Sequence, residues 1–372
     1  MDDLWAPGRT VLKVLCALIY CGACPSFMFA APGDAGFDFL QLTDGPRQAA
    51  MAGTGIAVAD DVGNASANPA ALGRIRRSEV SFTGMRYVES GSYGGLRIAE
   101  SLKSGGALGL EVHSFDFGGF DTFDGSGSRT GSAKAGDLLY SLGYGRSFGP
   151  SFFAGGRVGR ITEKIADRSG STWTADAGAL YVPYVDGWLS HTRFGVAAKN
   201  IGPGAAFQSE KTSLPRTLGA GAACQLFSEA LTAAADLEKP SVGSAVLSLG
   251  GELWVNRGLA LRAGWLQSKD FSNGFRVGFG MRFGDFGLDY SLQTDNGGFG
   301  DVHRIGVSFR FGGREEALYQ EGVRLLQEGR VGEAILKFNE VLEINPTHRR
   351  AVERLREAAL KLKEESSKDA PH

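Results

Sequence analysis

Glu111 and His113 are the residue pair in this sequence best placed to do acid–base chemistry. They lie two residues apart in a stretch that alternates apolar and polar residues, so both side chains fall on one face of a strand. A carboxylate beside an imidazole can pass a proton to or from a bound molecule. A single histidine of this kind more commonly has a structural role, which is the interpretation we favour.

Other catalytic signatures are missing from the sequence. It contains no nucleophile elbow, phosphate-binding Walker loop, zinc motif or calcium loop. The stretch "GTGIAVAD" (53–60) suggests a dinucleotide loop, but it lacks the third glycine and a preceding strand. We therefore predict that the protein is not an enzyme and binds no cofactor and no metal.

Charged side chains recur on the polar faces of the alternating stretches. If these faces line an interior, arginines and carboxylates would pair with each other and with any segment held inside. One arginine could instead hold a ligand carboxylate. The residues concerned are Arg262, Arg276, Arg282, Arg310, Asp236, Glu238 and Asp289.

A period of two runs from about residue 77 to residue 312. In "GFRVGFGMRF" (274–283), for example, the phenylalanines fall on one face, while the arginines and glycines take the other. About fourteen such segments can be counted, most of them about 10–14 residues long, which is enough for a tilted strand to cross a bilayer. They begin near residues 77, 92, 106, 135, 151, 171, 188, 214, 231, 245, 259, 273, 286 and 301.

The connections between these segments alternate in length. Short turns such as "FGPS" (148–151) and "NRG" (256–258) alternate with long loops such as 200–216 and 293–302. Short turns on one side and long loops on the other are typical of outer-membrane barrels. We predict an all-β transmembrane barrel of about 14 antiparallel strands over residues 77–312. The alternative is a secreted soluble β-sandwich or propeller.

The first 31 residues differ from the rest. An apolar run follows Arg9 and Lys13 and ends at the small residues Ala30 and Ala31, as in a secretory signal peptide. Acylation at Cys24, as in a lipoprotein, is the alternative. Cleavage after residue 31 would leave Cys224 as the one remaining cysteine, so no disulfide framework is possible. A formal net charge of −2 gives no reason to expect nucleic-acid binding.

Residues 32–76 form a Gly- and Ala-rich segment without strand alternation. The segment is too small for its own core, so we expect it to plug the barrel as an N-terminal hatch. Its turn at Asn68, Pro69 and Ala70 combines a fixed proline φ with an amide that can bond the wall. This turn holds the plug in place or forms part of a movable gate.

The stretch "RIGVSFRF" (304–311) ends the barrel. Its polar-x-Gly-x-x-aromatic-x-aromatic spacing resembles the signal by which the barrel-insertion machinery recognises a last strand. The matching residues are Arg304, Gly306, Phe309 and Phe311.

Residues 313–372 are a separate helical piece. They carry 11 Lys or Arg and 12 Asp or Glu among 60 residues, too many charges for an element in lipid. Residues 315–348 have the length of one tetratricopeptide repeat, and a third, capping helix follows. The alternative is an ordinary helical hairpin. The residues at signature positions are Leu318, Gly322, Leu325, Ala334, Phe338, Val341 and Pro346.

The hatch and one strand-loop region resemble the FadL-like outer-membrane barrels, especially their PorV/PorQ-like branch. Departures are Ala50, Ala52 and Ala71, where glycine is common in the family. The resemblance spans roughly residues 37–312. The matching residues are Gly45, Arg47, Met51, Gly53, Ala59-Asp60-Asp61, Asn68-Pro69-Ala70 and Leu72, then Lys199-Asn200, Gly202-Pro203 and Leu214-Pro215.

The resemblance implies a plugged fourteen-stranded barrel in the outer membrane of a diderm bacterium, with the helical tail in the periplasm. FadL itself moves long-chain fatty acids, and PorV-like relatives serve protein secretion. We expect uptake of long-chain fatty acids or similar hydrophobic molecules; the alternative is a PorV-like secretion or assembly factor. Besides the lipid bilayer and the insertion machinery, a periplasmic protein is an expected partner at the tail. Tentative ligand-lining residues are Phe37, Phe39, Leu40 and Leu42.

Overall fold

A computed structural model describes residues 36–87, 91–102, 105–185, 187–207, 210–269, 273–294, 300–311, 313–346 and 348–368. The predicted signal peptide therefore lies outside the described residues. Among these residues, no helix combines the length and the apolar composition that a membrane span needs.

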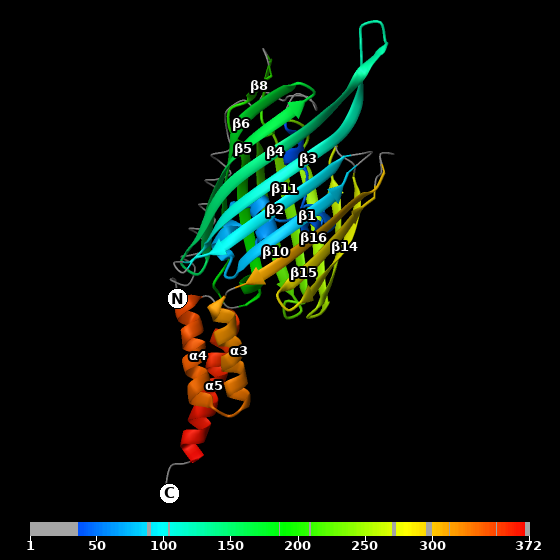
Figure 1. The fold of residues 1–372 in the computed structure, drawn as a ribbon. Coiled ribbons are helices and arrows are strands. Elements are labelled where there is room, and N and C mark those ends of the chain that lie inside the picture. The colour runs from blue at the N-terminus through cyan, green and yellow to red at the C-terminus, as the bar shows by residue number, and fades with distance from the viewer. Residues whose placement is uncertain are drawn as a thin grey trace, which may run out of the picture.

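Fourteen strands close into one antiparallel barrel (Figure 1), as the alternation predicted. Each strand pairs with its neighbours in sequence, and the first strand closes the ring by pairing with the last, Ser78 opposite Phe311. Closure leaves no free sheet edge, which a membrane-spanning sheet requires. The strands are β1 (Ser78–Arg86), β2 (Ser92–Ser101), β3 (Ala107–Phe123), β4 (Arg129–Phe148), β5 (Phe152–Ile165), β6 (Arg168–Tyr181), β7 (Thr192–Ile201), β10 (Thr217–Leu226), β11 (Leu231–Pro240), β12 (Val246–Asn256), β13 (Leu259–Gln267), β14 (Gly274–Phe283), β15 (Phe286–Gln293) and β16 (Val302–Phe311).

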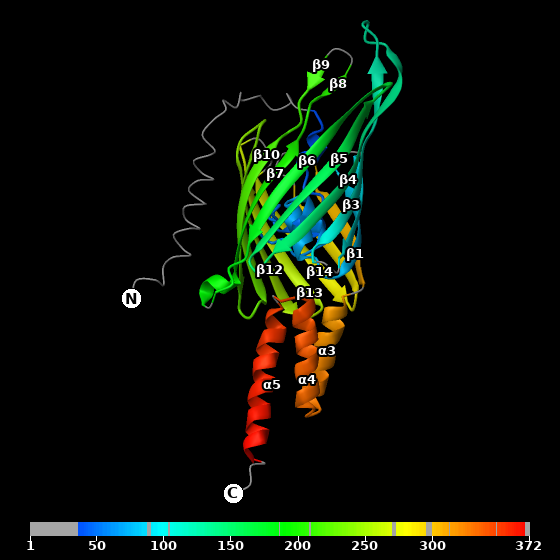
Figure 2. The ribbon, with the colours of Figure 1, turned by 90° about the vertical axis from the view of Figure 1, so that its left-hand side faces the viewer.

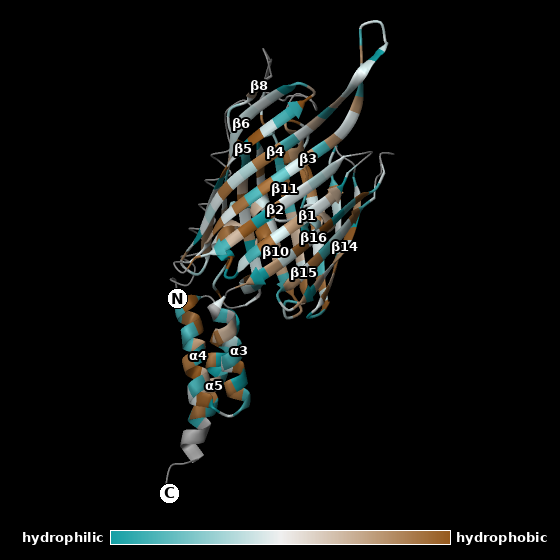
Figure 3. Ribbon diagram, viewed as in Figure 1, coloured by the Kyte–Doolittle hydropathy of each residue, from teal (hydrophilic) through white to brown (hydrophobic). Residues whose placement is uncertain are grey.

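The outer face of the barrel is apolar and the inner face is mixed. Figure 3 shows hydrophobic and hydrophilic residues interspersed along the strands. On β4, for example, Tyr140 and Leu142 are exposed, whereas the alternating residues Leu139 and Ser141 are buried. Exposed aromatics gather at the turns of one end, as in the aromatic girdle of a membrane barrel. They are Phe148, Phe152, Phe227, Phe283 and Phe286. These features make it a transmembrane barrel rather than a soluble sandwich or propeller.

The two ends of the barrel differ (Figures 1 and 2). At the hairpin end, β3 and β4 continue beyond their neighbours as a projecting ribbon, and a small sheet of β8 (Ala205–Phe207) and β9 (Glu210–Thr212) lies in the loop after β7. At the tail end lie short turns, the 3-10 helix η4 (Trp188–His191) and the C-terminal helices. The expected strict alternation of loop lengths is wrong at two places. The tail-end connection from Tyr181 of β6 to Thr192 of β7 is long and carries η4. β5 and β6 are joined at the hairpin end by a tight turn, with Ile165 paired to Arg168.

Residues 36–77 fill the lumen (Figure 2), where the hatch was predicted. They form short helices because Pro and Gly interrupt every run: η1 (Asp38–Gln41), α2 (Pro46–Ala50), η2 (Val62–Ser66) and η3 (Pro69–Arg74). Asp61 and Asn68 cap η2 and η3 by accepting hydrogen bonds from the backbone N–H groups of Asn64 and Ala70. Buried alanines then pack this segment against the wall.

The tail consists of three helices: α3 (Arg314–Gln327), α4 (Val331–Ile344) and α5 (Arg349–Lys368). Leu318, Leu325, Ala334 and Phe338 are buried in its core, and a Cβ on Gly322 would press into the Phe338 ring. A hydrogen bond from the Arg330 guanidinium lowers the pKa of Glu333, which keeps a negative charge at the start of α4. Pro346 follows the end of α4. The tetratricopeptide interpretation stays a prediction.

Candidate functional site

The hatch rests directly on lumen-facing glycines of the wall. A Cβ on Gly155 would clash with the Pro69 carbonyl, one on Gly178 with the Asn68 side chain, and one on Gly195 with the Ile56 carbonyl. Glycine is required at Gly155 and Gly195 because backbone meets backbone, and at Gly178 because the buried Asn68 side chain lies against it. The abundance of glycine in the sequence is thus partly explained by the seat of the plug.

Asn68 fastens the hatch to itself and to the wall. Its amide nitrogen donates to the Ile56 carbonyl at 2.8 Å and to the Ala179 carbonyl of β6 at 3.1 Å, while its oxygen accepts from Ala70 N–H. Asn68, Pro69 and Ala70 are all buried. The predicted gate residues therefore lie in the tightest part of the plug, and their role as a gate stays a prediction.

Ion pairs hold the other side of the hatch. Arg47 of α2 contacts Asp60, Asp61 and the wall residue Glu252 at 2.5–2.8 Å. Glu252 also accepts from Arg262 at 2.7 Å, and Arg262 reaches Asp289 at 2.7 Å. Of the predicted polar lining, Arg262, Arg282 and Asp289 belong to this chain of ion pairs, Arg310 pairs with Glu79, and Asp236 accepts from Gly55 and Ile56 N–H.

A second cluster of polar groups lies nearer the hairpin end, around Asp44 of the hatch. Asp44 accepts hydrogen bonds from Tyr93 and Arg97, and His113 Nδ1 lies 3.7 Å from it. His113 Nε2 is 3.5 Å from Glu111, which also binds Arg157. Glu111 and His113 share the lumen face, as predicted. Both side chains lie in a network of ion pairs with Asp44 and Arg157. No group of three or more His, Cys, Asp or Glu side chains in the described ranges could hold a metal.

An apolar cluster fills the lumen on the hairpin side of Asp44. Phe37 and Phe39 share this cluster with side chains from six barrel strands and from the loop between β7 and β10. Leu40 and Leu42 are partly buried against the same cluster. Its other buried members are Met85, Tyr93, Phe115, Leu139, Ile161, Ala205, Leu214 and Val302.

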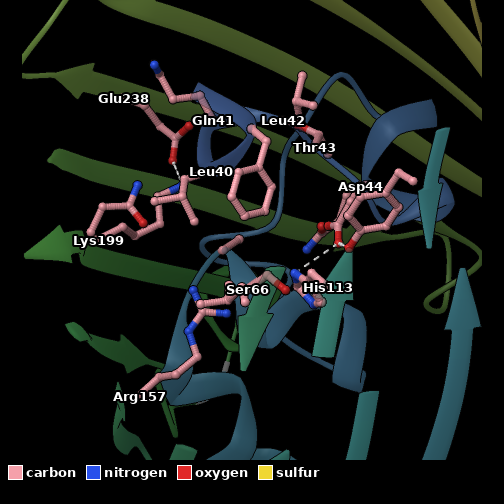
Figure 4. Close-up of a pocket in the computed structure, with 17 residues that line it drawn as sticks. Leu40, Gln41, Leu42, Thr43, Asp44, Ser66, His113, Arg157, Lys199 and Glu238 are labelled. Carbon is pink, nitrogen blue, oxygen red and sulfur yellow. Dashed lines mark hydrogen bonds and ion pairs between the residues drawn. The ribbon is translucent and has the colours of Figure 1, made fainter. Parts of the chain in front are cut away.

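A cavity of about 70 Å³ lies between this cluster and the polar groups (Figure 4). Phe39, Leu40 and Leu42 line this cavity, whereas Phe37 packs in the cluster behind, and their role in binding a ligand stays a prediction. The opposite wall is polar and includes His113 and Arg157. In Figure 4 the ion pair of Lys199 with Glu238 crosses one side of the cavity. The arrangement offers an apolar surface to one part of a molecule and polar groups to another.

Solved structures with the same architecture are transport channels. The Pseudomonas putida toluene transporter TodX aligns at a TM-score of 0.52 and 14% identity, covering 72% of this chain and 97% of that one. The CymD monoaromatic hydrocarbon channel aligns at 0.52 and 13%, covering 72% and 96%. The chain has the fold of these channels. At such low identity the likeness concerns the fold and not the substrate.

No family model matches the chain, and no curated protein matches it either. The alignment with TodX covers 72% of this chain, and the remainder is long enough to include the helical tail. The residues around Asp44, namely Tyr93, Arg97 and Arg157, were missed by sequence reasoning. Tyr93 and Arg97 lie on β2 and Arg157 lies on β5, and only the fold brings them to Glu111 and to Asp44 of the hatch.

Proposed function

We propose that the protein is an outer-membrane channel for the uptake of hydrophobic small molecules, with long-chain fatty acids as the first candidates, and that it is a FadL-like barrel. The observation that carries this proposal is the apolar cluster of Phe37, Phe39 and wall side chains inside a membrane barrel. Apolar side chains inside a lumen give a hydrophobic solute a place to leave water.

The cavity is too small for a long acyl chain in the conformation described. An apolar protein cavity of about 150 Å³ binds a molecule as small as benzene, and this cavity measures about 70 Å³. The ligand would therefore take the place of the Phe37–Leu42 segment, whose side chains occupy the cluster. Movement of that segment leaves the glycine seat of the hatch intact.

A matched pair of variants on β4 tests this proposal. Leu139 lines the cavity and is 2% exposed, whereas Leu142, on the same strand, faces outward and is 68% exposed. Leu139→Trp should block uptake of radiolabelled oleate by diderm cells that lack another channel for it. Leu142→Trp should leave uptake unchanged, and heat-modifiable gel migration should show that both barrels are folded.

Uptake that is equal with and without the protein would contradict the transport proposal. It would favour the alternative, a PorV-like secretion or assembly factor, which needs no path through the lumen. In either case we propose that the barrel-insertion machinery assembles the chain through the residues around Phe309 and Phe311, which are exposed and stacked at 6.0 Å.

The tail is the second part of the proposal. We place it in the periplasm, where a tetratricopeptide-type unit would bind a soluble protein that receives the ligand. Arg349 donates hydrogen bonds to Ser190 next to β7, at 2.8 Å to its hydroxyl and 3.2 Å to its carbonyl. This contact supports a tail that stays close to the lumen exit.

A further inference from the structure

Two buried arginines of the lumen, Arg276 and Arg304, differ from the others. The buried arginines Arg47, Arg97, Arg157 and Arg262 all pair with carboxylates. Within the described parts of the chain, neither Arg276 nor Arg304 pairs with a carboxylate, although they are only 8% and 2% exposed.

The hydrogen bonds of Arg304 are also incomplete. Arg304 Nη2 donates to Gln293 Oε1 at 3.3 Å, while its Nε and Nη1 have no partner among the described residues. The same holds for the hydroxyl of Ser291, which is 1% exposed. Water could satisfy these hydrogen bonds, but it could not neutralise two buried positive charges, whose burial is costly without an opposite charge.

Strand register brings the three residues together. Ser291 of β15 is paired with Arg304 of β16, and Arg276 of β14 is paired with Gln293, two residues further along β15. Arg276 and Arg304 are close enough to repel each other electrostatically. Asp44 is near Arg304 but already accepts hydrogen bonds from Arg97 and Tyr93. All of the free groups are positive or able to donate.

The apolar cluster begins directly beside this site. Arg304 is paired with Met85 across the β1–β16 seam, and Val302 lies two residues before it on the same strand and face. Both Met85 and Val302 belong to the cluster around Phe37 and Phe39. A molecule with its head at Arg304 could lay an apolar chain along them.

We propose that Arg276, Ser291 and Arg304 form an anion-binding site that holds the charged head of an amphipathic ligand while its apolar part lies against Met85 and Val302. The head would be a carboxylate, sulfate or phosphate monoester, since a guanidinium fork binds such planar or tetrahedral oxyanions with paired hydrogen bonds. This inference rests on the proposed uptake function. It adds which residues hold the charged head of the ligand, a head that the hydrocarbons in the names of the structurally similar channels lack.

Binding of short soluble amphiphiles tests the site. The protein in lipid nanodiscs would be titrated with octanoate, octyl sulfate, octyl phosphate and octanol, all below their micellar concentrations, by calorimetry. We expect the best anion to bind at least about tenfold tighter than octanol, because hydrogen bonds to charged groups are the strong ones. The rank order among the three anions identifies the head.

The double variant Arg276→Gln with Arg304→Gln should lose about 10- to 100-fold in anion affinity and keep octanol affinity. The matched control is Arg160→Gln, since Arg160 is exposed over the Trp173 ring, and it should bind as the unaltered protein does. A second readout excludes a merely structural role. Without ligand, the double variant should melt at a higher temperature than the unaltered protein, because a repelling buried pair is removed.

The outcomes separate the two proposals. Octanol binding with no preference for any anion overturns the anion site alone, as does an anion preference that survives the double variant. A double variant that melts at a lower temperature also overturns it. Failure of octanol and of every anion to bind overturns the anion site together with the proposed uptake function.

Discussion

In the two halves of the lumen, the N-terminal segment contacts the wall in different ways. Towards the tail end, the hatch touches wall glycines through its backbone and binds Glu252 through Arg47. Towards the hairpin end, the Phe37–Leu42 segment touches the wall through apolar side chains, next to a cavity and two arginines that pair with no carboxylate among the described residues.

This difference indicates where a ligand can enter. Backbone-to-backbone seating and buried ion pairs resist any shift of less than the whole segment, because a partial shift leaves charges unpaired. Apolar side chains can be exchanged for other apolar groups at little cost. The tail-end half therefore acts as a fixed plug, and the hairpin-end half is the part that a ligand can remodel.

The largest expected effect comes from disturbing the glycine seat. Gly155→Val places side-chain carbons where the Pro69 carbonyl lies, so the hatch cannot dock. Gly156→Val is the matched control on the same strand, since the nearest atom to its Cβ is 3.6 Å away. We expect Gly155→Val to lose the heat-modifiable folded form or to expose the hatch to protease. A folded, protease-resistant Gly155→Val protein would contradict the fixed-plug interpretation.

The next largest effect is expected from replacing Arg47, which pairs with carboxylates, and it is compared with the effect of replacing Arg276. Arg47→Gln leaves Asp60, Asp61 and Glu252 without their shared partner, so the free energy of unfolding should fall by about 3–5 kcal/mol. Arg276→Gln should instead raise the free energy of unfolding. Urea denaturation in detergent, followed by tryptophan fluorescence, measures both. Destabilisation of similar size in the two variants would show that the halves do not differ in this way.

Most of the barrel could be predicted from the sequence because its signal is local. Alternation sets the faces of each strand, so Phe275 and Arg276 were assigned correctly to opposite sides. The hatch was found by the same reasoning, since a segment without strand alternation needs a wall to bury it. The tight β5–β6 connection was not predicted from the sequence. Its two-residue turn at Ala166, which has a positive φ, carries no glycine to mark it.

The candidate site could be predicted only in part, because it depends on register across strands. The side chains of Phe39, Leu40 and Leu42 were assigned to a pocket from local apolarity, and the cavity lies against them. Arg304 was read as the polar residue of a terminal signal, although it is buried in the lumen beside Ser291. Nothing in the spacing of residues 276, 291 and 304 shows that they meet, since the registers of the β14–β15 and β15–β16 hairpins decide their partners.

The smallest expected effect on the barrel comes from removing the tail. Arg349 of the tail donates hydrogen bonds to Ser190 of the barrel, and Gly313, just before the tail helices, lies against the Arg77 side chain. Exposed contacts of this kind contribute little to stability, and the tail has its own buried core around Phe338. Deleting residues 314–372 should therefore leave the heat-modifiable barrel and its melting temperature unchanged.

The same deletion should abolish cross-linking to a periplasmic protein, with Arg349→Ala as an intermediate variant that loosens the tail without removing it. If the truncated barrel fails to fold, the tail supports the plug or assembly of the barrel; if both chains capture the same proteins, the tail is not the docking element.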